Sequence, residues 1–189
     1  MAAGARQPSV VVALLARGSA ALMLAAVASL AAKGWRMTAA AGPARSAQEL
    51  GPVVVVTAAW VSLLYVFLFN QSATATAEHR RLRREAQAQG GAAPTLAAVK
   101  YGAVPSALML CATRTVGNFL EQALPFLLAL YAHAALVSCR DAARCGWLWL
   151  LARSYYPLVY SMRFPALLLS TVPSYLCVAY MLATAVRAL

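Results

Sequence analysis

The chain has 189 residues and a formal net charge of +11, from sixteen basic and five acidic residues. Hydrophobic residues make up 62% of it and charged residues 11%, whereas a soluble domain is closer to half apolar and a quarter charged. The composition favours an integral membrane protein and leaves no room for a separate soluble domain. The basic residues lie mostly between apolar runs, which is typical of contacts with lipid headgroups, and no motif of a nucleic-acid-binding protein is present.

The first apolar segment, residues 9–33, is rich in alanine and carries Arg17 in its middle. We expect an additional N-terminal helix there, which either spans the membrane or lies at its surface. The first forty residues contain no acid and resemble an organellar targeting sequence. Residues 1–49 are therefore predicted to be an N-terminal segment with a linker, and residues 50–189 the main membrane domain.

Residues 52–70 carry no charge and are long enough to cross the hydrocarbon of a bilayer, which takes about 20 residues. The polar stretch that follows predicts a continuation of the same helix until the sequence GGAAP at 90–94 breaks it. This stretch contains the most basic motif, HRRLRRE at 79–85, and the positive-inside rule would place it on the cytoplasmic or equivalent side.

Three further apolar helices are predicted. The first runs from Pro105 to about residue 138, with a kink at Pro125, whose missing N–H leaves the carbonyl of Glu121 free. The others cover residues 146–163 and 165–187. Together with residues 52–70, these segments predict an all-α integral membrane four-helix bundle, to which the N-terminal apolar helix is added.

Cysteine and histidine spacing argues against a metal site, because no CxxC pair is present and the two histidines stand alone in the sequence. Cys139 and Cys145 flank a predicted short loop. The sequence leaves two alternatives open for them: a disulfide, if the loop faces an oxidising compartment, or two free thiols at helix ends.

The stretch RTVGNFLEQALPF at 114–126 places polar residues within an apolar run. Arg114, Asn118 and Glu121 have the spacing i, i+4, i+7, which puts them on one narrow stripe of a helix. Charges at membrane depth face other protein or a wet cavity, so we expect this stripe to face the bundle interior or a pocket. Arg114 and Glu121 are about 10 Å apart along the helix and need partners from elsewhere.

A second polar group follows in ARSYYPLVYSMR at 152–163, which holds Arg153, Tyr155, Tyr156, Tyr160 and Arg163. A guanidinium pairs well with a carboxylate in a low-dielectric site, so Arg153 is a candidate partner for Glu121. Two interpretations remain equal at this point. The two groups either bind a small anionic or zwitterionic ligand, or form an ion-pair network that only fixes the packing of the helices.

RTVGNFLEQALPFLLAL resembles the second-helix signature of the MAPEG superfamily, the membrane-associated proteins of eicosanoid and glutathione metabolism. That signature is an arginine, three residues, an asparagine, two residues and a glutamate. ARSYYPLVY resembles a later signature of the same family, Ala-Arg followed by two tyrosines about five residues apart, which Tyr155 and Tyr160 match. The resemblance covers about residues 50–188.

The resemblance implies a four-helix bundle that assembles as a homotrimer in the lipid bilayer and takes glutathione as co-substrate, without a metal. It implies ligand-binding roles for Arg114, Asn118, Glu121, Arg153 and Tyr155. Tyr156, from the polar group at 152–163, is a further candidate for ligand binding, and Tyr160 and Arg163 are the candidate catalytic residues. The sequence departs from the family at Gln122, where several active members have tyrosine, and Arg163 matches the thiol-activating arginine only loosely.

Two functions follow from these observations. The first is a glutathione-dependent transferase or peroxidase that acts on lipophilic substrates in an endomembrane or organellar membrane, mitochondrial or plastid. The second is an accessory subunit of a larger respiratory or photosynthetic membrane complex that kept the bundle without the chemistry. Whether the chain is an enzyme is left open by the sequence. Four or five helices without an inverted repeat give little sign of a transporter.

Overall fold

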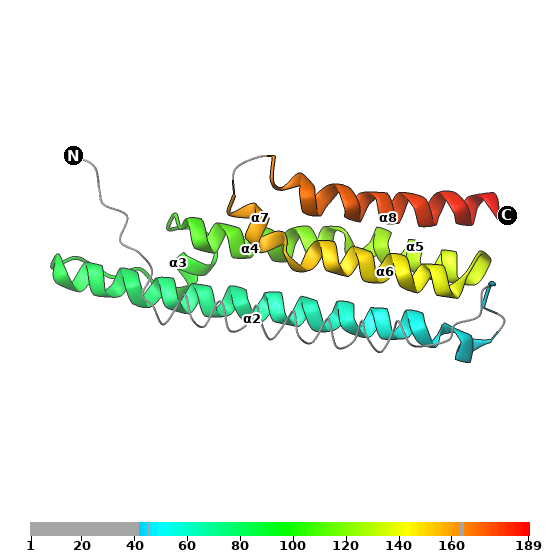
Figure 1. Cartoon of the computed structure of the whole chain (residues 1–189). Coiled ribbons are helices and arrows are strands. Elements are labelled where there is room, and N and C mark those ends of the chain that lie inside the picture. Colours follow the sequence, from blue (N-terminus) through cyan, green and yellow to red (C-terminus); the bar gives the residue numbers. More distant parts are fainter. Residues whose placement is uncertain (1–41, 45, 163–164) are drawn as a thin grey trace.

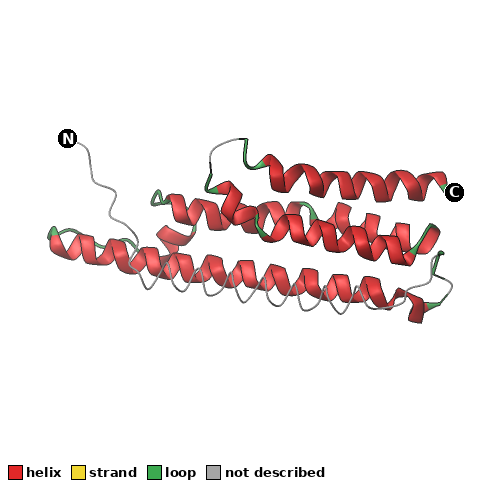
Figure 2. Ribbon diagram, in the orientation of Figure 1, coloured by secondary structure: helices red, strands yellow, loops and turns green. Residues whose placement is uncertain are grey.

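The computed structural model describes residues 42–44, 46–162 and 165–189, so the helix expected at residues 9–33 lies outside the described part of the chain. Its five longer helices are α2 (Gly51–Ala88), α4 (Ala107–Glu121), α5 (Ala123–Leu136), α6 (Cys139–Ser154) and α8 (Leu168–Arg187). Three short ones are η1 (Ala47–Leu50), α3 (Leu96–Lys100) and α7 (Tyr156–Tyr160). Figure 2 shows that short loops join these helices, and the expected all-α fold is confirmed.

The helices lie side by side in three layers (Figure 1). α2 packs against α4 and α6 on one side of the molecule, and α8 packs against α5 and α6 on the other. The α4–α5 pair and α6 therefore form the middle of the bundle. Among the described helices, α6 packs against α2, α5 and α8, so it connects the two sides of the bundle.

α2 is one continuous helix of 38 residues, as predicted for residues 52–70 and the polar stretch after them. At 1.5 Å per residue it is about 57 Å long, nearly twice the roughly 30 Å of bilayer hydrocarbon, so its C-terminal part projects beyond the membrane. It ends at Ala88, just before Gly90, which adopts a φ of 67° that favours glycine.

The predicted helix from Pro105 to residue 138 is divided into α4 and α5 by a turn at Gln122. α4 begins at Ala107, where the side chain of Ser106 accepts a hydrogen bond from the N–H of Met109. The turn lies three residues before Pro125, which cannot donate a hydrogen bond to the carbonyl four residues earlier. The predicted kink is therefore present, and the apolar segment continues through it.

The third helix differs from the prediction of residues 146–163. α6 begins at Cys139, because Ser138 caps it by accepting a hydrogen bond from the N–H of Asp141, and it ends at Ser154, before Pro157. The stretch between Cys139 and Cys145 is helical and not the expected loop, and both thiols are free. Six residues of helix separate the two by about 9 Å, which is too far for a disulfide.

Aromatic side chains fill the region where α2, α4, α5 and α6 meet. Phe119 stacks on Trp60 and packs edge-on against Phe67, each at 5.3 Å between ring centroids. Phe126 stacks on Trp149 at 4.0 Å, and Trp149 also contacts Phe119. Each such pair contributes about 0.5–1.5 kcal/mol beyond area burial, so these rings fix the register of the middle layer against α2.

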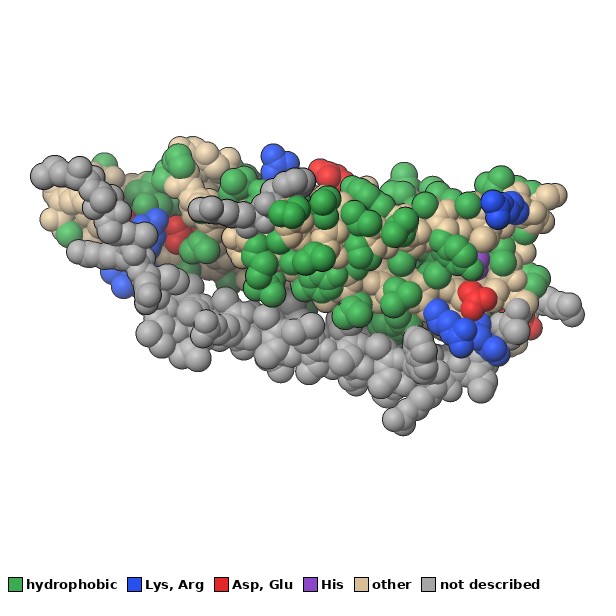
Figure 3. All heavy atoms as spheres, turned by 45° about the horizontal axis from the view of Figure 1, so that its top comes forward, with side chains coloured by type: hydrophobic (Ala, Val, Ile, Leu, Met, Phe, Trp, Pro, Cys, Tyr) green, Lys and Arg blue, Asp and Glu red, His purple; other side chains and the backbone are tan. Residues whose placement is uncertain are grey.

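Three helical segments of the described chain are long and apolar enough to cross a membrane: Ala47–Ala88, Ala107–Leu136 and Leu168–Arg187. Figure 3 shows apolar side chains covering the middle of the visible face, with most charged side chains toward the two ends. The protein is therefore an integral membrane protein. α6 is shorter and lies among these three.

An ion-pair cluster marks the projecting end of α2. Glu78 is buried, accepts hydrogen bonds from Arg81 and from Ser106, and Arg81 also pairs with Glu85. The hydrogen bond to Glu78 raises the pKa of Arg81 above its ordinary value, against the effect of partial burial. Because Ser106 caps α4, this cluster ties the start of α4 to α2.

Candidate functional site

α4 has two distinct faces. Its buried residues are Met109, Ala112, Thr115, Val116 and Phe119. At 100° per residue these centre about 160° away from Arg114, so the stripe of Arg114, Asn118 and Glu121 lies opposite the packed face. Arg114 and Glu121 are exposed and Asn118 is half-buried. Of the two expected positions for this stripe, the bundle interior or a pocket, the interior therefore does not hold for Arg114 and Glu121 in a single chain, in which only Asn118 turns toward another helix.

Hydrogen bonds between α2 and α4 fix the depth of this stripe. The amide of Gln71 donates to the hydroxyl of Thr113 at 3.3 Å, and Gln71 directly follows the uncharged run at residues 52–70. Arg114 therefore lies near the end of the membrane span. The antiparallel course of the helices then places Glu121 seven residues deeper, about 10 Å into the hydrocarbon. An ionised carboxylate is costly at that depth unless protein or a ligand covers it.

Arg153 lies near the end of α6 and is 1% exposed. Its Nη1 donates a hydrogen bond to Oδ1 of Asn118, which connects α6 to the polar stripe. Its Nε and Nη2 find no acceptor among the described residues. A buried guanidinium with free N–H groups is a binding site for a carboxylate or another anion, because each missing hydrogen bond costs about 1–3 kcal/mol.

Aromatic rings enclose this guanidinium. The rings of Trp149, Tyr156 and Tyr175 lie 5.5, 5.9 and 5.8 Å from its central carbon, within the range of cation–π attraction. Tyr175 is 47% exposed, and its hydroxyl accepts a long hydrogen bond of 3.5 Å from the Gln122 amide. Tyr175 thus covers Arg153 on the outer side of the bundle and is itself weakly held.

The three predicted tyrosines differ in their surroundings. Tyr156 is buried, and its ring lies 5.8 Å from that of the half-buried Tyr160. The hydroxyl of Tyr155 donates to the carbonyl of Leu169 at 2.8 Å, so this residue connects the end of α6 to α8. Arg163 lies outside the described residues.

The structure thus brings together Arg153, Asn118 and Tyr156, whereas Arg114 and Glu121 lie on the outer surface near them. Glu121 does not pair with Arg153 and has no ion-pair partner within the described ranges. Sequence reasoning missed Tyr175 and Gln122 as parts of this site. Their contact joins residues 53 positions apart, and no local spacing reveals it.

A family model supplies the decisive comparison. The model described as the MAPEG family matches residues 53–187, which include all of α4, α6 and α8 and every predicted site residue. The chain belongs to the MAPEG family. No curated protein and no solved structure matches it. The matched region begins near the start of α2 and ends at the last residue of α8.

Side chains that would suit a metal ion do not gather anywhere in the part of the chain that the structure describes. The chemistry of the site is instead that of two arginines, two amides, one carboxylate and several phenols. Such a set can hold carboxylates and an ammonium group, and its cations and phenolic hydroxyls can stabilise a thiolate.

Proposed function

We propose that this MAPEG family member binds glutathione at the polar stripe of α4 and the end of α6, and transfers it to lipophilic electrophiles or uses it to reduce lipid hydroperoxides. The observation that carries the proposal is the buried guanidinium of Arg153, in which two nitrogens, Nε and Nη2, have no acceptor in the described chain. A glutathione carboxylate would supply the missing acceptors.

The neighbouring residues have complementary chemistry. Arg114 would bind the second carboxylate from the headgroup level, and Glu121 would accept a hydrogen bond from the ligand's ammonium group. Asn118 already holds Arg153 in place and keeps its amide nitrogen for the peptide backbone of the ligand. Tyr175 would have to move aside, which its exposed ring and long hydrogen bond favour.

In the proposed reaction the thiol of glutathione releases its proton to water, and the hydroxyl of Tyr160 and the cation of Arg163 stabilise the resulting thiolate. The sulfur then forms a bond to an electrophilic carbon while the leaving group departs with the bonding electrons. With a hydroperoxide as substrate, two glutathione thiols are oxidised to one disulfide and the hydroperoxide is reduced to an alcohol and water.

The outward position of Arg114 and Glu121 supports an assembly of identical chains, because a neighbouring copy would cover both charges at membrane depth. We propose a homotrimer in an endomembrane or organellar membrane, with the basic end of α2 on the cytoplasmic or equivalent side. Native mass spectrometry in detergent tests the number of chains, and a monomer at every concentration would contradict this part of the proposal.

Glutathione binding to the purified protein in nanodiscs, measured by calorimetry, tests the function directly. We expect wild-type protein to bind, and Arg114→Ala to bind about 10–100-fold more weakly, because it loses a charge-assisted hydrogen bond of about 1.5–3 kcal/mol. Arg187→Ala is the matched control, since Arg187 is an exposed cation at the last residue of α8. Absence of binding by wild-type protein would sink the proposal.

A second variant separates binding from chemistry. Tyr160→Phe keeps the ring and loses only the hydroxyl, so we expect its glutathione affinity to stay within about twofold while kcat for conjugation of a model electrophile falls about 10²-fold or more. Equal kcat values for wild type and Tyr160→Phe would remove Tyr160 from the mechanism and leave the binding site intact.

One observation favours the second candidate, an accessory subunit of a larger membrane complex. Arg153 is almost fully enclosed in the single chain, so the site is closed unless Tyr175 moves. If Tyr175→Ala, which opens the site, also fails to bind glutathione, the accessory role becomes the better explanation. Co-purification of unrelated membrane subunits in stoichiometric amounts would then support it.

A further inference from the structure

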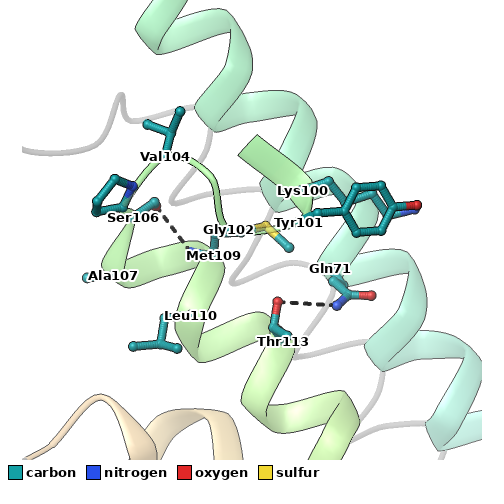
Figure 4. A pocket seen from close by; sticks show the side chains of 11 residues that line it. Gln71, Lys100, Tyr101, Gly102, Val104, Ser106, Ala107, Met109, Leu110 and Thr113 are labelled. Atoms are coloured by element: carbon teal, nitrogen blue, oxygen red, sulfur yellow. Dashed lines mark hydrogen bonds between the residues drawn. The ribbon is translucent and has the colours of Figure 1, made fainter. Parts of the chain in front are cut away.

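A cavity of about 600 Å³ lies between α2, the segment after α3 and the start of α4. Figure 4 shows Lys100 and Tyr101 at one side of it, Gln71 and Thr113 below them, and Met109 beneath the loop. None of the residues assigned to glutathione lines this cavity. Any function of the cavity is therefore independent of the proposed function and needs a separate account.

The cavity lies at the level of the lipid headgroups. Its inner limit is the hydrogen bond between Gln71 and Thr113. Gln71 is the first residue after the uncharged run of α2, so this limit lies at the edge of the hydrocarbon. Its outer limit is Ser106, which donates to Glu78 seven residues further along α2. The cavity thus occupies about the first 10 Å beyond the hydrocarbon, where an amphiphile changes from acyl chain to polar head.

The lining is apolar with a single charge. Met109 and Leu110 supply the apolar wall on α4, and Leu110 is 52% exposed, which leaves that wall open. Lys100 is the only charged residue between Ala86 and Thr113. Its ammonium lies 5.6 Å from the centre of the Tyr101 ring, and both side chains are exposed.

The acid at the outer limit of the cavity does not cancel this charge. Glu78 is held by Arg81 and by Ser106, so its negative charge is already compensated within the ion-pair cluster. The amide of Gln71 and the hydroxyl of Thr113 bond mainly to each other. From the described residues, a ligand of this cavity therefore meets one available cation, one phenol and an apolar wall.

We propose that this cavity binds a single-chain anionic amphiphile. The carboxylate of a fatty acid is its simplest form, with the head at Lys100 and Tyr101 and the chain along Met109 and Leu110. The volume lies within the range of about 300–1,000 Å³ that holds one small ligand, and the single cation matches a single negative charge. A two-chain phospholipid would leave most of its apolar surface outside the cavity.

Photolabelling tests the proposal. The probe is hexadecanoic acid with a diazirine near its carboxylate, added to the wild-type protein in nanodiscs of neutral lipid, and mass spectrometry maps the labelled peptide. We expect labelling within residues 100–113 that unlabelled hexadecanoic acid displaces. Lys100→Glu should weaken the apparent affinity at least tenfold, and Lys100→Arg should keep it within about threefold. Arg83→Glu is the control, because Arg83 is an exposed cation of α2 that does not line the cavity.

Each other outcome overturns the proposal. Labelling confined to peptides that contain neither residues 100–113 nor Gln71 would place the site elsewhere. Equal displacement by hexadecanol would show that charge plays no part, and equal displacement by a two-chain anionic phospholipid would make the occupant a bulk lipid. An equal loss in Arg83→Glu would reduce the effect to surface charge. Circular dichroism of each variant shows that the helices are intact.

Discussion

The two sides of α4 differ in whether contacts within a single chain bury and pair their side chains. The packed side, where Phe119 lies among Trp60, Phe67 and Trp149, is closed by contacts with α2 and α6. The outer side carries two exposed charges, Arg114 and Glu121, at or below the headgroup level. One helix thus combines a side that packs within the chain with a side whose charges remain exposed in the single chain.

This difference separates stability from function. A substitution on the packed side removes contacts within the chain, so it should act mainly on the free energy of unfolding. A substitution on the outer side removes groups that have no partner in the described chain, so it should act mainly on binding or assembly. Matched pairs of variants, one from each side, test whether this division holds.

The largest effect is expected at Phe119, which is 1% exposed. Phe119→Ala should lower the free energy of unfolding by about 3–5 kcal/mol, because it removes the ring that contacts three other aromatic side chains and leaves a cavity. The neighbouring Leu120 is 47% exposed on the lipid side, and Leu120→Ala should cost less than about 1 kcal/mol. Reversible unfolding in mixed micelles measures both, and equal losses would break the comparison.

A smaller difference in the free energy of unfolding is expected between substitutions of two carboxylates, Glu78 and Glu121. Glu78→Gln should cost about 1–3 kcal/mol, because it removes the charge that holds Arg81 and weakens the bond to Ser106, the cap of α4. Glu121→Gln should change the free energy of unfolding by less than about 0.5 kcal/mol, since no described residue pairs with it.

The two carboxylates also differ in their expected effect on glutathione binding. Glu121→Gln should weaken it about tenfold, through loss of a charged acceptor, while Glu78→Gln should leave it unchanged. Calorimetry on folded protein gives this second measurement. A stability loss in Glu121→Gln as large as that in Glu78→Gln would show that Glu121 is satisfied within the chain and serves only packing.

Composition and proline positions were sufficient to predict most of the fold. The uncharged run at residues 52–70 lies in α2, and the helix break predicted near Pro125 is present three residues before it, as the loss of an N–H donor requires. The helix predicted over residues 146–163 instead ends at Ser154, before Pro157. The prediction was also wrong at the start of α6. There the cap of Ser138 begins a helix in a stretch whose charges, such as Asp141, are typical of a loop.

The candidate site could be predicted less completely. The spacing i, i+4, i+7 placed Arg114, Asn118 and Glu121 on one stripe, and that holds for the helix. Periodicity cannot tell whether a polar stripe faces its own bundle or the outside. A stripe that faces outward is also shielded from lipid when a second chain packs against it. The contact between Gln122 and Tyr175 depends on the packing of α8 beside α5 and α6, which no local pattern encodes.

The smallest effect compares two helical glycines. A Cβ added at Gly146 would lie 2.6 Å from Cγ1 of Val56 and 3.0 Å from Cδ1 of Leu130, where α6 packs against α2 and α5. Gly146→Ala should therefore lower the free energy of unfolding by about 1–2 kcal/mol, since overpacking outweighs the gain in helix propensity. At Gly117, on the outer side of α4, a Cβ would meet nothing within 4 Å. Gly117→Ala should raise stability by up to about 1 kcal/mol, and a loss there would mean that another chain packs closely on this side.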